Sequence, residues 1–242
     1  MTTNVFDEVK GYMATDSRWS IRQGKYIVYL DDTGCDKIEV TKGHAFMFAG
    51  NGGRIQQWKN WIRSAPTDNS QQPATEGICI CVVDINERKV KLSVKQKMIP
   101  VGGFFAGSGT NFAVTCWQKN NDANMSVETA KKQDFCSGGE VKYFDFVNNA
   151  HNLSYPNANV TIDMVDAAIL KRGLVMTTNE HTAQILPFPA AAADNTEIAE
   201  IRAKLAAGDL SASAPSEGMY DEWTAEEKKA LEKTFAEIFS WN

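Results

Sequence analysis

The sequence predicts an α+β fold, in which short strands and amphipathic helices follow one another along a chain of 242 residues. Runs of β-branched and aromatic residues end at glycine-containing turns in the first two thirds of the chain. Several stretches between these runs carry apolar residues at helical spacing. The hydrophobic fraction of 43% is that of an ordinary globular protein with a full-sized core.

The first third of the chain reads as strands followed by one helix. We expect strands at Val5–Phe6, Tyr12–Ala14, Tyr26–Leu30 and Lys37–Val40, and an apolar run at His44–Gly50. A helix is predicted from Arg54 to about Arg63. The residues that would share its apolar face are Ile55, Trp58, Trp61 and Ile62.

The middle of the chain predicts a meander and two helices. Consecutive antiparallel strands are expected at Ile78–Ile85, Val90–Val94 and Met98–Val101. The glycine-rich segment Gly102–Gly109 then leads into a helix at Asn111–Gln118. A second helix is expected at Ser126–Phe135, with Ser126 as its N-cap, before a strand at Val141–Val147.

Composition changes after about Leu186, which predicts a domain at 1–186 and a helical extension at 187–242. A helix is expected at about Thr196–Ala207, and Gly208–Gly218 reads as a flexible linker. Thr224 and Glu227 form a capping box for a last helix. Its apolar stripe, Leu231 to Phe239, is expected to need a partner surface such as a neighbouring subunit or an unfoldase.

Charge and cysteine usage exclude several functions. A net charge of −5 with no basic cluster argues against nucleic acid as a partner. No apolar run is long enough for a membrane span, and we expect no signal peptide. Five cysteines, without paired CxxC spacing, indicate reduced thiols in a cytoplasmic protein that needs no metal or other cofactor. We interpret His44, His151 and His181 as structural or surface residues.

The start of the chain, Met1-Thr2-Thr3, offers a nucleophile. Removal of Met1 would leave Thr2 with a free α-amine, which titrates near neutrality and so is able to act as general base for the hydroxyl of the same residue. Many proteins begin in this way, and the commoner meaning is an ordinary start. The nucleophile therefore depends on the motifs that follow.

Five further segments resemble those of N-terminal-nucleophile hydrolases of the proteasome β-subunit type, including the bacterial ATPase-partnered peptidases. In the family's order they are Tyr12–Arg18, Asp36–Ile38, Phe48–Gly50, Ala106–Gly109 and Gln133–Val141. The resemblance spans roughly Thr2 to Val147. It implies a four-layer αββα sandwich, here with a C-terminal helical extension.

The resemblance also implies the roles of single residues. Thr2 would attack a peptide carbonyl, Lys37 held by Asp16 would lower the pKa of the amine and hydroxyl, and the N–H of Gly50 would form the oxyanion hole. The other implied site residues are Ser108, Asp134 and Ser137 around the amine, Ser20 beside an extended substrate, and Phe48 near the first specificity pocket. The implied assembly is a homo-oligomeric ring that encloses peptide or unfolded protein, with an ATPase unfoldase as a further partner.

Other functions remain open on the sequence. Asp16-Ser17-Arg18 is also an ordinary turn with a surface ion pair, and Lys37 on a strand is commonly solvated. Asn4 stands where the family has an apolar residue, and the spacing from Thr2 to Asp16 is shorter than usual. A non-catalytic scaffold, binding or inhibitory protein is therefore one alternative. An amidase that acts on a small molecule is another.

Overall fold

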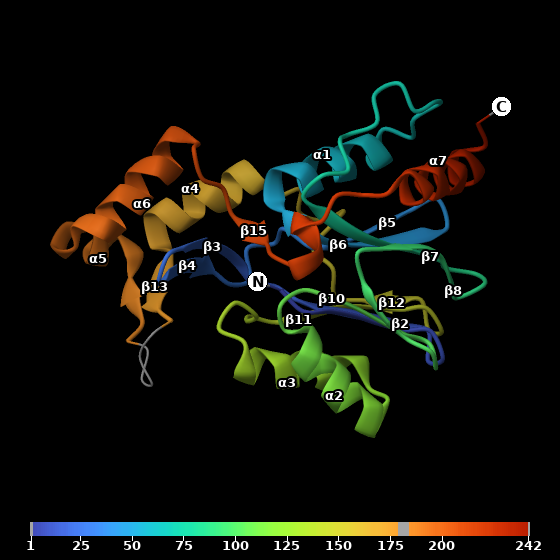
Figure 1. The fold of residues 1–242 in the computed structure, drawn as a ribbon, viewed down its shortest axis with the longest axis horizontal. Helices are drawn as coiled ribbons and strands as arrows, with labels where there is room; N and C mark the ends of the chain where they lie inside the picture. The colour runs from blue at the N-terminus through green and yellow to red at the C-terminus, as the bar shows by residue number, and fades with distance from the viewer. Residues whose placement is uncertain (1, 179–183, 242) are drawn as a thin grey trace.

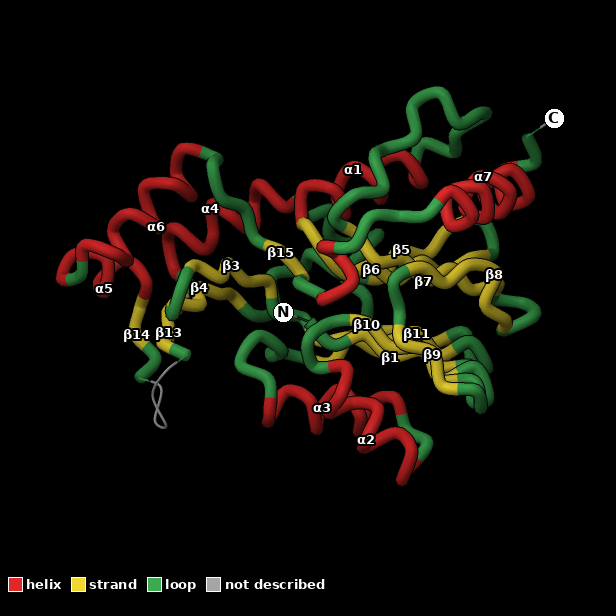
Figure 2. Tube along the Cα trace, viewed as in Figure 1, coloured by secondary structure: helices red, strands yellow, loops and turns green. Residues whose placement is uncertain are grey.

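The computed structural model describes residues 2–178 and 184–241. Its strands form two antiparallel sheets, with helices on their outer sides (Figure 1). The coloured tube in Figure 2 shows the two sheets lying one over the other between the groups of helices. The predicted α+β class is therefore confirmed.

The six-stranded sheet holds the first strand of the chain at its centre, in the order β12-β11-β2-β1-β10-β9. Its strands are β1 (Asn4–Asp7), β2 (Tyr12–Asp16), β9 (Lys97–Ile99), β10 (Gly103–Ala106), β11 (Val141–Asp145) and β12 (Ala150–His151). In register, Val5 lies opposite Ala14 on one side and Phe105 on the other. Because β1 is paired on both sides, the residues just before it are held firmly.

The nine-stranded sheet follows the order β14-β13-β4-β3-β15-β6-β7-β8, and β5 also pairs with β6. Its strands are β3 (Trp19–Gln23), β4 (Tyr26–Leu30), β5 (Ile38–Thr41), β6 (His44–Asn51), β7 (Ile78–Asp84), β8 (Lys89–Val94), β13 (Leu174–Thr177), β14 (Leu186–Pro187) and β15 (Ser213–Ala214). The two-residue strand β15 lies between β3 and β6, so a late segment of the chain joins two early ones.

The helices cover the two outer faces. α2 (Thr110–Asn120) and α3 (Ala123–Gln133) lie on the six-stranded sheet. The other helical segments are α1 (Gly52–Arg63), α4 (Ile162–Arg172), α5 (Phe188–Asp194), α6 (Thr196–Ala207), the short 3-10 helix η1 (Glu217–Tyr220) and α7 (Ala225–Phe239), grouped on the side of the nine-stranded sheet (Figure 1). Among the described residues, no helix has the length and apolar character needed to cross a membrane.

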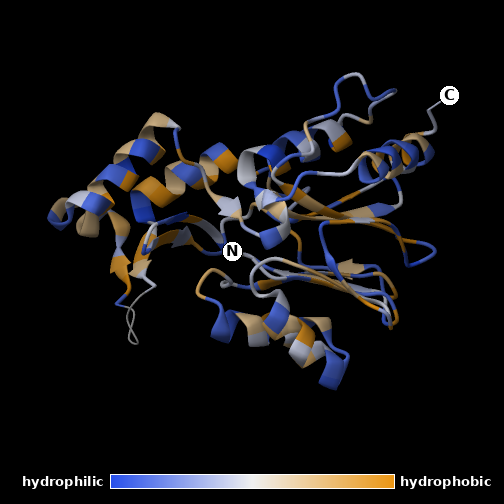
Figure 3. Cartoon of the chain, viewed as in Figure 1, coloured by the Kyte–Doolittle hydropathy of each residue, from blue (hydrophilic) through white to orange (hydrophobic). Residues whose placement is uncertain are grey.

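Strand alternation divides the core between the layers. Phe6 packs with Met47 and other residues of the facing sheet, whereas its neighbour Val5 packs with Val127 of α3. A third cluster joins the nine-stranded sheet to its helices and includes Trp58. Figure 3 shows hydrophobic residues along the strands and many hydrophilic residues on the outer helices. This burial of both faces of β1 fixes its register.

Several predicted elements need correction. Met98–Val101 does not continue the meander, because β9 pairs with β10 in the other sheet. Asp122, not Ser126, caps α3: its side chain accepts from the N–H of Met125, and Ser126 is buried inside the helix. The predicted linker Gly208–Gly218 contains β15 and the start of η1.

The last helix confirms one prediction and corrects another. The capping box between Thr224 and Glu227 is present. The apolar stripe, however, has its partner within the same chain: the ring of Phe235 lies 5.6 Å from Trp58 and 5.2 Å from Trp61. The stripe therefore completes the core and needs no second protein to cover it.

Candidate active site

Thr2 lies two residues before the start of β1 and is fully buried. Its Oγ1 accepts a hydrogen bond of 2.6 Å from Nζ of Lys37 and donates one of 2.5 Å to Oδ1 of Asp16. The three side chains come from the N-terminus, from the segment before β5 and from the end of β2. The structure thus brings together three predicted site residues that are distant in sequence.

Lys37 and Asp16 form an ion pair that solvent does not reach. Nζ of Lys37 lies 2.8 Å from Oδ1 of Asp16, and both side chains are 0% exposed. Burial lowers the pKa of Lys37, and the charge of Asp16 and its hydrogen bond oppose that shift. A cation in so dry a setting interacts strongly with any charge that develops on Oγ1 of Thr2.

Asp16 is held by backbone N–H groups as well as by Lys37. Its Oδ1 accepts from the N–H of Thr3 at 2.8 Å, and its Oδ2 accepts from Gly138 at 3.0 Å and Arg18 at 3.2 Å. Hydrogen bonds of this kind stabilise the charged carboxylate. They also fix the orientation in which it meets Lys37.

Ser108, Asp134 and Ser137 form a second polar cluster beside the first. Oδ2 of Asp134 accepts hydrogen bonds of 2.6 Å from both serine hydroxyls. The Ser137 hydroxyl also lies 2.7 Å from Oγ1 of Thr3. The three predicted residues therefore lie together. They contact the N-terminal segment through the side chain of Thr3, the neighbour of Thr2.

The turn that carries Ser108 requires glycine on both sides. Gly107 has φ of +105°, and a Cβ there would come within 1.9 Å of the carbonyl oxygen of Thr2. A Cβ on Gly109 would come equally close, at 1.9 Å, to Oγ1 of Thr3. The glycines allow this turn to pack directly against the N-terminal segment.

Gly50 occupies a backbone position that other residues rarely adopt. Its φ is +125°, and a Cβ would lie 2.1 Å from the carbonyl oxygen of Gly77. Gly50 lies opposite Ala214 of β15. Phe48, two residues earlier, is fully buried in the hydrophobic core and does not line the cavity described below.

Asn4 ties the two sheets together at this point. Its Nδ2 donates to the carbonyl of Phe48 at 2.8 Å, and its Oδ1 accepts from the hydroxyl of Thr15 at 2.6 Å. The sequence marked Asn4 only as a departure from an apolar pattern. Its buried amide links β1 to β6, the strand that contains Gly50.

Residues 211–216, which we call the strap, cross the site beside Ser20. Ser213 of the strap lies opposite Ser20 of β3, and the carbonyl of Pro215 accepts from the N–H of Thr2 at 3.2 Å. A cavity of about 510 Å³ is lined by the strap together with Ser20, Arg22 and Ser108. Sequence analysis predicted a flexible linker at these residues and did not predict the strap.

The remaining candidate groups stay outside this cluster. Nε2 of His44 lies 3.6 Å from Asp84, His151 stacks on Phe144, and His181 is outside the described residues. All five cysteines are unpaired and buried, as expected. Within residues 2–178 and 184–241, no three His, Cys, Asp or Glu side chains group as metal ligands do.

Comparisons with known proteins give structural likeness only. No protein-family model and no curated protein sequence matches the chain. The structure of Thiobacillus denitrificans BPH in complex with epoxomicin is 13% identical, with a TM-score of 0.38 over 59% of this chain and 96% of that one. A second structure of Thiobacillus denitrificans BPH is 14% identical, with a TM-score of 0.36 over 59% and 95%. Eukaryotic HslV from Trypanosoma brucei is 15% identical, with a TM-score of 0.30 over 59% and 99%.

Proposed function

We propose that the protein is a threonine-type peptidase, in which Thr2 becomes the nucleophile once Met1 has been removed. The observation that carries the proposal is the contact of 2.6 Å between Oγ1 of Thr2 and the buried ammonium of Lys37. Burying an ion pair against a threonine hydroxyl lowers the stability of the fold, because both charges lose their hydration. Such a pair is expected where it positions a reactive hydroxyl.

The proposed reaction has two steps. The free amine of Thr2 takes the proton of Oγ1 as that oxygen bonds to a peptide carbonyl carbon, and Gly50 donates its N–H to the developing oxyanion. Collapse of the tetrahedral intermediate breaks the peptide C–N bond, and the leaving amine takes the proton. Water then hydrolyses the ester and restores the threonine. Lys37 stabilises the negative charge that develops on Oγ1, and Ser108, Asp134 and Ser137 position the N-terminal segment through Thr3.

The surrounding architecture is part of the proposal. We assign the two sheets and their outer helices to a four-layer αββα sandwich, with residues 1–186 as the hydrolase domain and 187–242 as its extension. A peptidase with so general a nucleophile must be kept from folded proteins, so we propose a homo-oligomeric ring in the cytoplasm. Peptides or unfolded proteins would be the substrates, delivered by an ATPase unfoldase.

Thr2→Ala tests the nucleophile. We expect the purified protein to begin at Thr2 by N-terminal mass spectrometry, and Thr2 to be modified by an epoxyketone. Thr2→Ala should abolish this labelling and lower kcat/KM for peptides by at least about 10³-fold, because the attacking atom is gone. Thr3→Ser is the matched control, since it keeps a hydroxyl beside Ser137. Equal peptide cleavage by Thr2→Ala and the parent chain would refute the proposal.

A non-catalytic binding protein is the second candidate. It is favoured by the strap, which already occupies the place beside Ser20. A chain that retains Met1, reacts with no epoxyketone and still binds peptides would support this candidate. The same N-terminal mass measurement therefore separates the two functions.

A further inference from the structure

The strap completes a sheet that would otherwise be divided at the candidate site. β3 and β6 are neighbours only through β15, where Ser213 lies opposite Ser20 and Asn51, and Ala214 lies opposite Gly50. A segment so placed is paired on both sides at Ser213, as a strand inserted into a gap in a sheet is. Burial alternates along it, with Ala212, Ala214 and Ser216 buried and the residues between them partly exposed.

The strap also meets the atoms that the proposed chemistry uses. The carbonyl of Pro215 accepts from the N–H of Thr2 at 3.2 Å, and this nitrogen is the proposed general base. Oγ of Ser216 accepts from the N–H of Gly107 at 3.1 Å, in the turn beside Ser108. A peptide supplied from outside would have to displace both contacts before it reached Oγ1 of Thr2.

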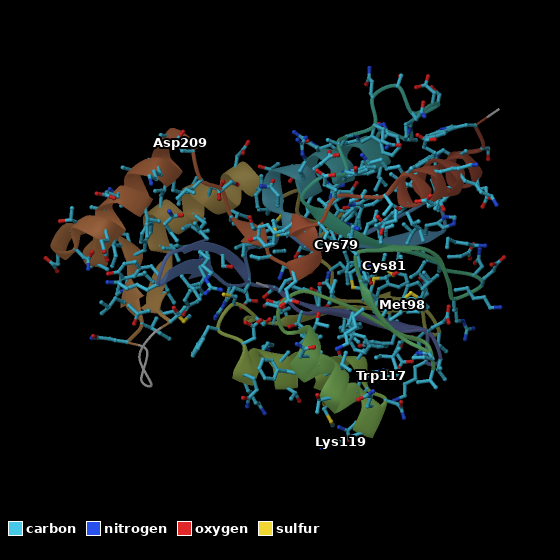
Figure 4. The ribbon with its side chains drawn as sticks, in the orientation of Figure 1. Cys79, Cys81, Met98, Trp117, Lys119 and Asp209 are labelled. Atoms are coloured by element: carbon cyan, nitrogen blue, oxygen red, sulfur yellow. The ribbon has the colours of Figure 1, made fainter. Side chains whose placement is uncertain are left out.

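The strap is anchored away from the chemistry. Asp166 of α4 accepts from the hydroxyl of Ser211 at 2.7 Å and from the N–H of Ala212 at 2.8 Å. The carbonyl of Ala212 packs so closely on α1 that a Cβ on Gly52 would come within 2.0 Å of it. Figure 4 labels Asp209, where the chain leaves α6 and approaches the strap. The figure also labels Cys79, which η1 covers where the chain leaves the strap.

We infer that the strap is an internal peptide ligand: it fills the groove between β3 and β6 and excludes other peptides until it is displaced. The inference rests on the proposed function of this site. The occupant also defines the class of ligand, which is an extended peptide with small side chains at the positions of Ala212 and Ala214. Both alanines are 0% exposed, which leaves no room for larger residues.

Two variants loosen the strap by independent means. Asp166→Ala removes both anchoring hydrogen bonds without touching the site, and Ala214→Lys places a charge at a position that is fully buried. Asp163→Ala on the exposed face of the same helix is the matched control. Each hydrogen bond to the carboxylate stabilises the closed strap. We therefore expect the population of chains with an open strap to rise about tenfold to a hundredfold in Asp166→Ala.

The probe is a fluorescein-labelled peptide with the sequence of residues 210–217, and its binding to the full chain is measured by fluorescence anisotropy. We expect both loosening variants to bind it at least about tenfold more tightly than the parent chain and Asp163→Ala. Hydrogen exchange of the amides of residues 211–214 and 216 should rise in the same two variants. Unchanged peptide affinity in both variants overturns the inference.

An epoxyketone separates this inference from the proposed function. If the inference holds with an active Thr2, both loosening variants are labelled at Thr2 faster than the parent chain. Equal labelling rates in the parent and the variants would show that the strap blocks nothing. Tighter peptide binding with no labelling in any chain would leave the strap as a displaceable ligand and would refute the peptidase.

Discussion

At the scale of single residues, the buried pair of Lys37 and Asp16 dominates the site. Neither side chain is reached by solvent, and the pair is satisfied by Thr2 and by backbone N–H groups. Removing one partner of such a pair leaves an unpaired charge and costs about 3–5 kcal/mol of stability. An arrangement this costly to disturb is expected to keep its geometry while a substrate binds.

The lowered pKa of Lys37 predicts how stability changes with pH. The pKa lies below the ordinary value of 10.5, so between the two values the unfolded chain binds more protons than the folded one. The contribution of Lys37 to the free energy of unfolding therefore becomes more favourable as pH rises towards 10.5. We expect the unfolding free energy of the parent, relative to that of Lys37→Met, to rise as the pH approaches 10.5 from below.

Urea denaturation at each pH measures this difference. The control is Lys10→Met, which removes a lysine from an exposed turn and so tests for a general effect of charge. A difference between the parent and Lys37→Met that does not change with pH, or the same change with pH in the difference between the parent and Lys10→Met, would contradict a lowered pKa.

Sequence patterns predicted the residues of the candidate site that the structure brings together, but not the residues that support them. Glycines and acidic residues in short motifs mark Asp16, Gly50 and Ser137, because tight turns demand particular residues at fixed places. Asn4 and Asp166 carry no such local signal. Their partners, Phe48 and Ala212, lie 44 and 46 positions away, and only the folded chain brings them together.

At the scale of elements, α7 should be a structural part of the core. Phe235 is fully buried and its ring lies 5.8 Å from Phe46 of β6. We expect Phe235→Ala to lower the free energy of unfolding by about 3–5 kcal/mol, because it leaves a cavity among aromatic rings. Chemical denaturation gives the value. Glu232→Ala, on the exposed side of α7, should stay within about 0.5 kcal/mol of the parent.

The elements that sequence analysis missed differ in how much signal they carry. The sequence of α4 carries a recognisable helix signal, because Thr161 caps the helix and Val165 and Ile169 share its buried side. β15 had none: Ser213 and Ala214 are small residues next to a proline, a composition typical of loops. They form a strand only because the edges of β3 and β6 are there to pair with them.

At the scale of the whole molecule, the proposed ring predicts that several chains associate. Val9 and Val101 are 79% and 64% exposed. They lie on adjoining turns, because a Cβ on Gly102 would come within 3.3 Å of Val9. Exposed apolar residues that gather in this way often mark an interface. We expect native mass spectrometry to show an assembly of several chains, each of about 26.7 kDa, and not the mass of one chain.

Val9→Asp and Val101→Asp should shift this assembly towards single chains, because each places a charge in the proposed contact. Met164→Asp changes an exposed apolar residue on α4 and serves as the control. A parent chain that remains a monomer at micromolar concentration would rule out a stable ring.

The position of β15 also sets an order of events during synthesis. Ribosomes release the chain from its N-terminus, so β3 and β6 emerge long before residues 213 and 214. Until then β3 and the end of β6 keep an unpaired edge, which is a template for pairing with other nascent chains. The chain is therefore most vulnerable to aggregation until residues 213 and 214 have left the ribosome and β15 has paired with β3 and β6.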